Sequence, residues 1–325
     1  MKGKYSGVPS FNKTTKDCGL RAGKILITGS NGLVGTAITS TLLDRGMKPL
    51  LFDIVGSGDD FGDVLDFGRV KDAVSRCIGI IHLAAVSRVT VGEKEPDHCW
   101  TTNVDGLQNV LRAIANSEEK PWLIFASSRE VYGSAERFPV TEEFPLRPVN
   151  IYGRSKLEGE RLVNSARHTG LRACTVRLSN VYGSTEDYSD RVVPAFAKAA
   201  AFGKELRVDG AEQMFDFTHV DDVAVGIIKL AELMDKCIAA PSPIQLVSGV
   251  PTTLNELAHL AIQLAGSSAT IRYTSPRDFD VGRFFGSASR AKKILDWEPS
   301  VAIENGLYKL ITDFRNLSDA DFVHV

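Results

Sequence analysis

The chain has 325 residues, of which 43% are hydrophobic and 24% are charged, and its formal net charge is -2. This composition is that of a globular protein with a full core, and the length suits one large domain or two fused lobes. The small net charge excludes the broadly basic surface that proteins use to bind nucleic acid or an anionic membrane, so we expect neither partner.

The five cysteines are scattered along the chain and include no CxxC pair. This pattern predicts inert buried thiols in a reducing compartment, with no disulfide framework and no metal site, and we expect a cytoplasmic protein. No apolar run reaches the roughly 18 residues that cross a bilayer. Residues 1–22 are polar and lack an apolar core, so we expect a flexible arm and no signal peptide.

The first half of the chain alternates two kinds of segment. Continuous runs of apolar and β-branched residues predict buried strands at 24–28, 49–53, 78–84, 122–126 and 173–178. Segments between and after these runs predict helices at 33–45, 103–115 and 152–165. The alternation indicates an α/β fold, a Rossmann-type doubly wound parallel sheet with helices on both faces.

After about residue 180 the pattern loosens, because Pro, Gly and Asp separate shorter pieces. We expect a strand at 244–248 and helices at 192–202, 220–234, 254–265 and 289–295. Residues 23–180 are therefore expected to form the Rossmann domain. Residues 181–325 are expected to form mainly a smaller C-terminal α/β lobe, with some segments returning to the Rossmann sheet.

A glycine-rich turn follows the first predicted strand, in the segment TGSNGLVG at 28–35. Gly29 permits the tight turn, Gly32 lets backbone approach a pyrophosphate, and Gly35 lets helix and strand pack closely. The N-terminus of the following helix offers free N–H groups to phosphates. Asp53 ends the second strand, where a carboxylate accepts hydrogen bonds from ribose hydroxyls and repels a 2′-phosphate. This arrangement predicts that the 23–180 domain binds NAD in preference to NADP.

Further residues near the strand ends are expected to complete the cofactor site. Asp63 and Val64 follow the third-strand region and are expected to hold the adenine. His82 ends a strand, and we interpret it as a core histidine without a chemical role. The other residues that we assign to the cofactor are Asn31, Leu33, Leu83, Ala84, Ala85 and Asn103.

Tyr152 and Lys156 form a YxxxK element on a predicted helix. Residues four apart lie on one helix face, about 6 Å from each other. A lysine ammonium beside a phenol favours the phenolate and lowers the pKa of the tyrosine. A tyrosinate is a general base that takes a proton from a hydroxyl while hydride leaves to NAD⁺. We therefore expect these two residues at the catalytic centre and assign both to cofactor binding as well, and we expect the positive charge of the bound nicotinamide to favour the phenolate too.

The strand at 122–126 runs into Ser127-Ser128-Arg129-Glu130, and the carboxyl ends of parallel strands are where such sheets bind ligands. Ser128 is expected to share a hydrogen bond with Tyr152 at the reacting oxygen. Glu130 is expected to reach the substrate. For both residues a capping or turn role is the alternative.

These segments together resemble the extended short-chain dehydrogenase/reductase family, in its NAD-dependent sugar-nucleotide epimerase/dehydratase branch. The resemblance covers about residues 24–312. The motifs that carry it are TGSNGLVG (28–35), Asp53, HLAA (82–85), NVDGLQNVL (103–111), SSREVYG (127–133), YGRSK (152–156), RLSNVYG (177–183), FDFTHVDDVA (215–224) and ILDWEP (294–299).

The resemblance implies a nucleotide-diphosphate sugar substrate, a homodimer, and transfer of hydride from a sugar carbon, usually C4, to bound NAD. It leaves several outcomes open: epimerase, dehydratase, decarboxylase, 4-keto-sugar reductase, or a non-catalytic NAD-sensing protein. Dehydratases of the family carry an Asp-Glu pair where this chain has Arg129 and Glu130, so ordinary dehydration is disfavoured. Decarboxylases share the glutamate. We expect an epimerase acting at C4, with Arg129 either pairing a substrate carboxylate or, as the stronger expectation, pointing to solvent.

Candidates for the substrate side also come from the resemblance, which places them mainly in the C-terminal lobe. The family usually has an arginine at the position of Phe215, so one phosphate ligand is missing here or is supplied by Arg191 or Arg283. Asp221 and Asp222 are expected to cap a helix. The substrate-binding candidates are Ser87, Ser128, Arg129, Asn180, Arg191, Arg207, Arg277, Asp280 and Arg283.

Overall fold

The computed structural model of the chain describes residue 20 and residues 23–56, 61–236, 239–277 and 281–317. Asp280 and, apart from Leu20, the expected N-terminal arm lie outside the described residues. The largest sheet has six parallel strands in the order β2-β1-β3-β4-β5-β9. These strands are β1 (Ile25–Thr28), β2 (Leu50–Phe52), β3 (Gly79–His82), β4 (Trp122–Ser128), β5 (Ala173–Leu178) and β9 (Ile244–Leu246).

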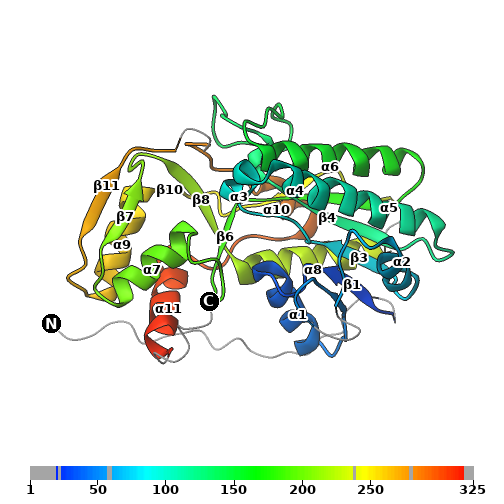
Figure 1. Cartoon of the computed structure of the whole chain (residues 1–325), viewed down its shortest axis with the longest axis horizontal. Coiled ribbons are helices and arrows are strands. Elements are labelled where there is room, and N and C mark those ends of the chain that lie inside the picture. The colour runs from blue at the N-terminus through cyan, green and yellow to red at the C-terminus, as the bar shows by residue number, and fades with distance from the viewer. Residues whose placement is uncertain (1–19, 21–22, 57–60, 237–238, 278–280, 318–325) are drawn as a thin grey trace.

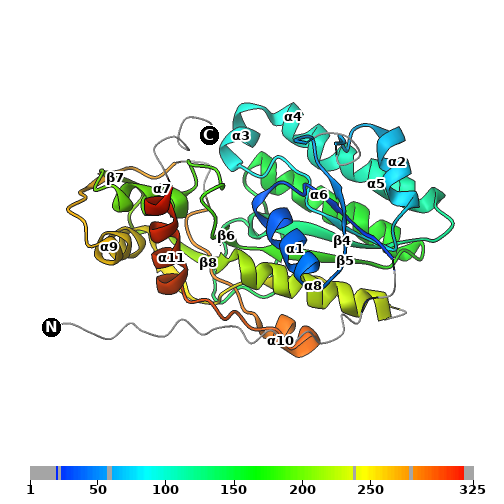
Figure 2. The same cartoon turned by 90° about the horizontal axis from the view of Figure 1, so that it is seen from below.

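Helices cover both faces of this sheet, as Figures 1 and 2 show. Alternate strand residues face opposite helix layers, so Ile25 and Ile27 pack with α1 and α8, whereas Leu26 packs with α2 and α5. The helices of this part are α1 (Leu33–Asp44), α2 (Phe67–Ser75), α3 (Val89–Lys94), α4 (Pro96–Trp100), α5 (Gly106–Asn116), α6 (Ile151–His168) and α8 (Val220–Lys236). A π turn at Thr101–Asp105 leads into α5, and a 3₁₀ turn at Arg129–Val131 follows β4.

A second group of elements lies beside the large sheet, at the left of both views (Figures 1 and 2). It holds a three-stranded sheet, β10-β8-β6, and a parallel pair of strands, β7 and β11. Its core packs α7, α9 and α11 around buried aliphatic and phenylalanine side chains. The bounds are β6 (Asn180–Tyr182), α7 (Val192–Ala201), β7 (Leu206–Asp209), β8 (Met214–His219), β10 (Pro251–Thr253), α9 (Leu254–Ala265), β11 (Ile271–Thr274) and α11 (Ile303–Asn316).

The chain crosses between the two groups more than once. After β6, α7, β7 and β8 it returns as α8 and β9, and β9 pairs with β5 to complete the large sheet. Helix α10 (Ser289–Leu295) also packs against this part. The expected α/β fold is therefore confirmed, whereas the division of roles between an NAD-binding domain and a substrate lobe stays a prediction.

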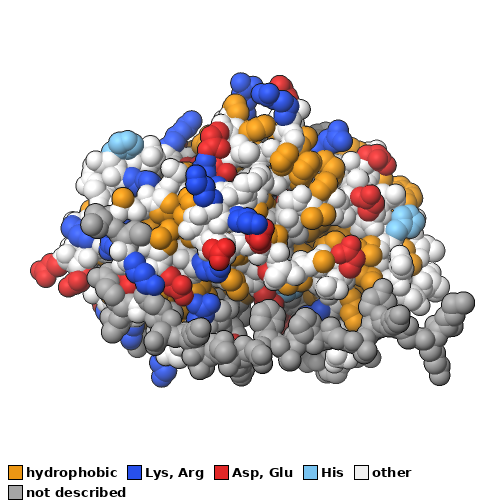
Figure 3. Space-filling view, turned by 180° about the vertical axis from the view of Figure 1, so that it is seen from behind, with side chains coloured by type: hydrophobic (Ala, Val, Ile, Leu, Met, Phe, Trp, Pro, Cys, Tyr) orange, Lys and Arg blue, Asp and Glu red, His pale blue; other side chains and the backbone are white. Residues whose placement is uncertain are grey.

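The predicted helices and strands are confirmed, with their ends shifted by at most three residues. Helices α2, α3, α4 and α11 and the short strands of the second group were not predicted. None of the helices that the structure describes is long and apolar enough to cross a membrane. Figure 3 shows basic and acidic side chains interspersed over the described part of one face, which agrees with the small net charge.

Candidate active site

The glycine-rich turn connects β1 to α1, and at two of its glycines the backbone lies so close to other backbone atoms that no side chain fits. Gly29 has a φ of 71°, and a Cβ there would lie 2.7 Å from the backbone nitrogen of Ala84. A Cβ on Gly35 would lie 2.2 Å from the carbonyl oxygen of Gly29. The residue before the helix, Gly32, has no side chain to cap α1. The first N–H groups of α1 are therefore left for a ligand, which suits a phosphate.

Asp53 lies directly after β2 and is tied to the same turn. Its Oδ2 accepts a hydrogen bond from the backbone N–H of Asn31 at 2.9 Å, and its Oδ1 accepts one from the N–H of Val55 at 3.0 Å. Each carboxylate oxygen has a second lone pair. The carboxylate is half-buried beside the open helix end, and these features fit a dinucleotide with its ribose at Asp53.

We expect Asp53→Ala to weaken NAD binding, because the ribose loses its acceptor and the glycine-rich turn loses a brace. A loss of roughly tenfold or more in affinity follows from removing a charged hydrogen-bond partner. Isothermal titration of the cofactor-stripped chain with NAD measures the effect. Asp44→Ala, at the exposed end of α1, is the matched control, and equal affinities for the two variants would refute the ribose assignment.

The other residues assigned to the cofactor lie around the ends of β2 and β3. Asp63 is exposed and accepts from the N–H of Leu65, while Val64 is buried in the core of this part. Asn103 is buried and bridges the loop after β3 to α6, because its amide bonds Val86 and Ser155. Asn103 therefore braces the site. Leu83, Ala84 and Ala85 are half-buried at the end of β3.

His82 is a core histidine, as expected. It is 1% exposed, and its Nδ1 lies 2.8 Å from the hydroxyl of Thr28. Burial, together with the charge of Lys156, lowers the pKa of His82 to about 3. The imidazole is therefore neutral at ordinary pH.

Tyr152 and Lys156 lie one turn apart in α6, whose N-terminus is capped by the side chain of Asn150. The side chain of Ser128, at the end of β4, acts on the Tyr152 phenol and lowers its pKa. Ser128 also caps the following 3₁₀ turn, since its Oγ accepts from the N–H of Glu130 at 3.2 Å. Ser128 therefore combines the two roles that were expected as alternatives, because it caps the turn and also acts on Tyr152.

The electrostatics of Tyr152 differ from the expectation. Burial raises the pKa of Tyr152 to about 12, and the bond to Ser128 and the charge of Arg191 only partly oppose this. Burial also lowers the pKa of Lys156 to about 8. The Lys156 Nζ donates to the carbonyl oxygen of Ala126 at 2.9 Å and lies 5.9 Å from the Tyr152 ring centroid. The expected fall of the tyrosine pKa was wrong for the chain alone, because desolvation exceeds the effect of nearby cations.

Arg129 does not point to solvent, and that expectation was wrong. It is 9% exposed, its Nε donates to Asn180 Oδ1 at 2.7 Å, and its Nη2 lies 2.9 Å from Glu130 Oε1. The guanidinium lies over the rings of Phe215 and Phe284, at 4.8 and 5.7 Å from their centroids. Phe215 thus provides a flat apolar face on which a guanidinium stacks favourably.

Glu130 is held at both carboxylate oxygens. Arg129 contacts Oε1, and Asn150 Nδ2 donates to Oε2 at 2.7 Å. The side chain of Glu130 is 6% exposed. Asn150 therefore contributes twice, because it caps α6 and orients Glu130, yet it was not among the predicted residues.

Ser87 and Arg191, both predicted on the substrate side, meet beside this group. Arg191 Nη2 donates to Ser87 Oγ at 2.9 Å, and Arg191 Nη1 lies 3.2 Å from Asp187 Oδ1. Arg191 belongs to the loop before α7, whereas Ser87 follows β3. The second group of elements therefore contacts the Rossmann part close to Tyr152.

Three other predicted arginines lie on exposed parts of the second group. Arg207 pairs with Asp209 at 2.7 Å, and the charge of Arg277 also acts on Asp209. Arg283 is exposed beside its β-bridge to Met214. The ion pair of Arg207 and the β-bridge of Arg283 both lie within the second group.

The expected capping role of Asp222 was wrong. Asp222 is 4% exposed within α8, and it accepts hydrogen bonds from Ser300 Nα, Ser300 Oγ and Val301 Nα. It therefore anchors the segment that leads to α11. The capping role expected for Asp221 was also wrong, because Asp221 lies inside the first turn of α8 and its own backbone N–H donates to His219 Nδ1, 3.5 Å from the Asp221 Oδ2.

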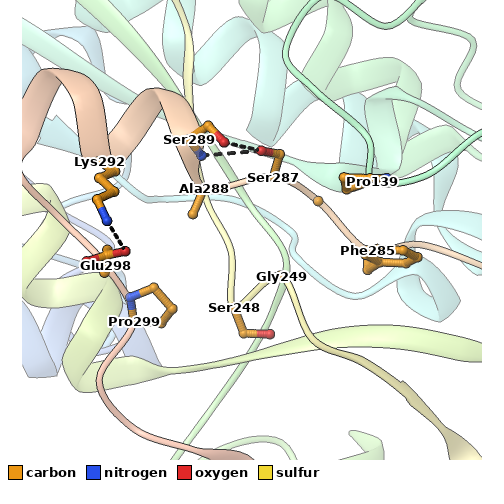
Figure 4. A pocket seen from close by; sticks show the side chains of 11 residues that line it. Pro139, Ser248, Gly249, Phe285, Ser287, Ala288, Ser289, Lys292, Glu298 and Pro299 are labelled. Atoms are coloured by element: carbon orange, nitrogen blue, oxygen red, sulfur yellow. Dashed lines mark hydrogen bonds and ion pairs between the residues drawn. The ribbon is translucent and has the colours of Figure 1, made fainter.

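Figure 4 shows a cavity that lies apart from these residues. Its lining includes Ser248, Ser287 and Ser289, and the ion pair of Lys292 and Glu298 closes one side. Ser248 is already bonded to the buried carboxylate of Asp216. None of the predicted site residues lines this cavity, so it does not bear on their chemistry.

Comparisons with known proteins agree with this geometry. The sequence model of the NAD dependent epimerase/dehydratase family matches residues 25–239. The UDP-glucose 4-epimerase of Mycolicibacterium smegmatis is 27% identical over 323 residues, covering 91% of this chain and 99% of the relative. UDP-glucuronic acid decarboxylase 1 of Xenopus tropicalis is 29% identical over 311 residues, covering 90% and 72%. The structure of the Thermotoga maritima UDP-glucose 4-epimerase with UDP-glucose has a TM-score of 0.83 at 28% identity, covering 90% and 98%.

Proposed function

Because the chain belongs to the NAD dependent epimerase/dehydratase family, we propose that it is a UDP-sugar epimerase that inverts C4 with bound NAD. The observation that carries this proposal is the different contacts of two polar side chains near Ser128, those of Tyr152 and Glu130. The side chain of Ser128 acts on the Tyr152 phenol and favours its ionised form, whereas Arg129 and Asn150 each donate to one oxygen of Glu130.

The hydrogen bonds of Glu130 favour epimerisation over elimination. Loss of water from a 4-keto sugar needs a base and an acid at the neighbouring carbons, in addition to the group that exchanges the proton of O4. Glu130 is the carboxylate closest in sequence to Ser128, and Arg129 and Asn150 hold it as an acceptor. Inversion at C4 removes and returns a proton at a single oxygen, so one phenol with one hydroxyl partner suffices.

In the proposed reaction, Tyr152 takes the proton of the C4 hydroxyl while C4 loses a hydride. After the keto sugar has rotated, the hydride returns to the opposite face of C4 and Tyr152 returns the proton to the oxygen. Ser128 bonds the same oxygen and orients it toward the phenol. NAD, held by the glycine-rich turn and Asp53, supplies a reversible hydride acceptor for C4. Lys156 stays close to both Tyr152 and the backbone of β4, where its ammonium favours the phenolate.

The substrate is proposed to lie between the carboxyl ends of β4 and β5 and the second group of elements. Asn180, Ser87 and Arg191 are the proposed contacts near the diphosphate and sugar. Arg207, Arg277 and Arg283 are proposed for the nucleotide end, since they are exposed on the second group. A homodimer and a cytoplasmic location stay predictions.

The test is incubation of the purified protein with UDP-, dTDP-, GDP- and CDP-sugars without added cofactor, read by mass spectrometry and NMR. We expect a UDP-sugar product of unchanged mass with inverted C4. Loss of water or carbon dioxide, or a reaction that requires added NAD(P)H, would overturn the proposal. Glu130→Gln keeps one acceptor oxygen at this position and is expected to keep turnover within about tenfold, in contrast to loss of a general base.

A further inference from the structure

The guanidinium of Arg129 is held in place from several sides. Its Nε donates to Asn180 Oδ1 at 2.7 Å, and its Nη2 lies 2.9 Å from Glu130 Oε1. Its flat face lies over the rings of Phe215, in β8, and Phe284, beyond β11. Four separate parts of the chain therefore fix one side chain, and a planar cation held in this way loses little freedom when it binds a ligand.

One end of this guanidinium has no partner among the described residues. The Nη1 of Arg129 is buried and makes no hydrogen bond to them, although the side chain as a whole keeps 10% of its surface exposed. Leaving an N–H group of a buried cation unpaired costs free energy, so native proteins seldom do so without a reason. The end of Arg129 that carries Nη1 is therefore a place where an acceptor from a ligand is expected.

The free donors of Arg129 suit a ligand group that has two acceptor oxygens. A guanidinium carries five N–H groups, of which Asn180 takes the one on Nε and Glu130 takes one on Nη2. The N–H groups that remain lie on Nη1 and Nη2, side by side in one plane. Such a fork matches the two oxygens of a carboxylate or a phosphate, whereas a neutral hydroxyl offers only one oxygen.

The place of Arg129 in the chain favours the carboxylate over the phosphate. Arg129 comes directly after Ser128, which in the proposed reaction bonds the oxygen on C4 of the sugar. The diphosphate is attached to C1, across the sugar ring from C4, whereas C6 is attached to C5, the neighbour of C4. An arginine next to Ser128 is therefore better placed for an anionic group at C6 than for the diphosphate.

We propose that Arg129 determines the specificity of this site, by pairing its Nη1 and Nη2 with a carboxylate at C6 of the sugar. The substrate is then a UDP-hexuronic acid and not a UDP-hexose. This inference rests on the proposed function and names its substrate class. Glu130, whose Oε2 accepts from Asn150, shares the guanidinium with the substrate.

The test measures binding in the NAD-loaded Tyr152→Phe protein, in which turnover is too slow to consume the ligand. Calorimetry compares UDP-glucuronate with UDP-glucose, which differ only at C6, and with UDP, which lacks the sugar. In this background Arg129→Met removes the cation, and Arg129→Met/Glu130→Gln also removes the carboxylate that the cation would leave unpaired. Arg154→Met, at an exposed position of α6, is the matched control.

We expect UDP-glucuronate to bind roughly ten- to hundredfold more tightly than UDP-glucose, as a charge-assisted pair at a buried site provides. Both variants that lack Arg129 are expected to reduce this ratio to about threefold or less, with the affinity for UDP changed by no more than about threefold. Arg129→Lys keeps the charge without the fork and is expected to give an intermediate ratio. General damage to the site would weaken all three ligands and leave the ratio unchanged, and Arg154→Met is expected to change neither quantity.

Equal affinities for UDP-glucuronate and UDP-glucose in the Tyr152→Phe protein would overturn the inference. A loss of UDP affinity with an unchanged ratio in the Arg129 variants would also overturn it, because the guanidinium would then act on the diphosphate. A preference for UDP-glucuronate that survives in these variants would assign the carboxylate to another residue. If the preference depends on Arg129 but the wild type does not invert C4 of UDP-glucuronate, the inference about Arg129 stands and the proposed function fails.

Discussion

Tyr152→Phe is expected to lower turnover by roughly 10²–10⁴-fold, because it removes the group that exchanges the proton of the substrate. The ring keeps its shape in a buried position, so folding and NAD content are expected to be unchanged. Steady-state kcat, together with the absorbance of NAD released on denaturation, measures both quantities. Tyr308→Phe, on the exposed side of α11, is the control. Wild-type turnover in Tyr152→Phe would exclude the phenol from the reaction.

Arg177→Met is expected to destabilise the fold by roughly 3–5 kcal/mol, because it leaves the buried carboxylate of Glu160 without its cation. Arg177 Nε and Nη2 lie 2.9 and 2.7 Å from the two oxygens of Glu160. Ser127 donates to the same carboxylate at 2.6 Å, and Arg177 Nη1 donates to Tyr132 Oη at 3.0 Å. Since Ser127 precedes Ser128, this network also supports the strand end that presents Ser128 to Tyr152.

Urea denaturation of the NAD-loaded protein measures the loss in the free energy of unfolding. Arg161→Met, which removes an exposed partner of Glu158 on α6, is the matched control, with an expected loss below about 1 kcal/mol. The double variant Arg177→Met/Glu160→Leu removes both charges and is expected to recover part of the stability. A loss in Arg177→Met no greater than that in Arg161→Met would show that the buried pair does not support the fold.

The Rossmann part was predictable because its strands are buried on both faces. Continuous apolar runs such as residues 122–126 leave little ambiguity, and glycines mark the turn before α1. The strands of the second group are three to six residues long, and β11 is half-buried or exposed throughout, so no such run identifies them. Helix α11 was overlooked although Leu307, Leu310, Ile311 and Phe314 have helical spacing.

The sequence predicted the site residues that lie on one helix or at the end of a neighbouring strand. Tyr152 and Lys156 share a helix, and Ser128 ends the neighbouring strand, so their spacing indicates their meeting. The surroundings of Arg129 depend on Phe215 and Phe284, which are distant in sequence.

Two further residues of the site were not predicted. Asp187 gave no signal, because an aspartate in a loop is usually solvated. The position of Asn150, just before the helix with YxxxK, is a capping signal that was available in the sequence.

The late return of β9 has a consequence for how the protein is made. The ribosome delivers β5 long before Ile244–Leu246, and the whole of α7, β7, β8 and α8 emerges between them. Until then β5 presents an unpaired edge, which is a site where exposed backbone associates with other chains. Strand β9 later covers this edge, when Ile244, Gln245 and Leu246 pair with Val176, Arg177 and Leu178 of β5. A nascent chain cut within this interval would carry an open sheet edge, and the two groups of elements cannot be produced as separate, complete proteins by dividing the chain once.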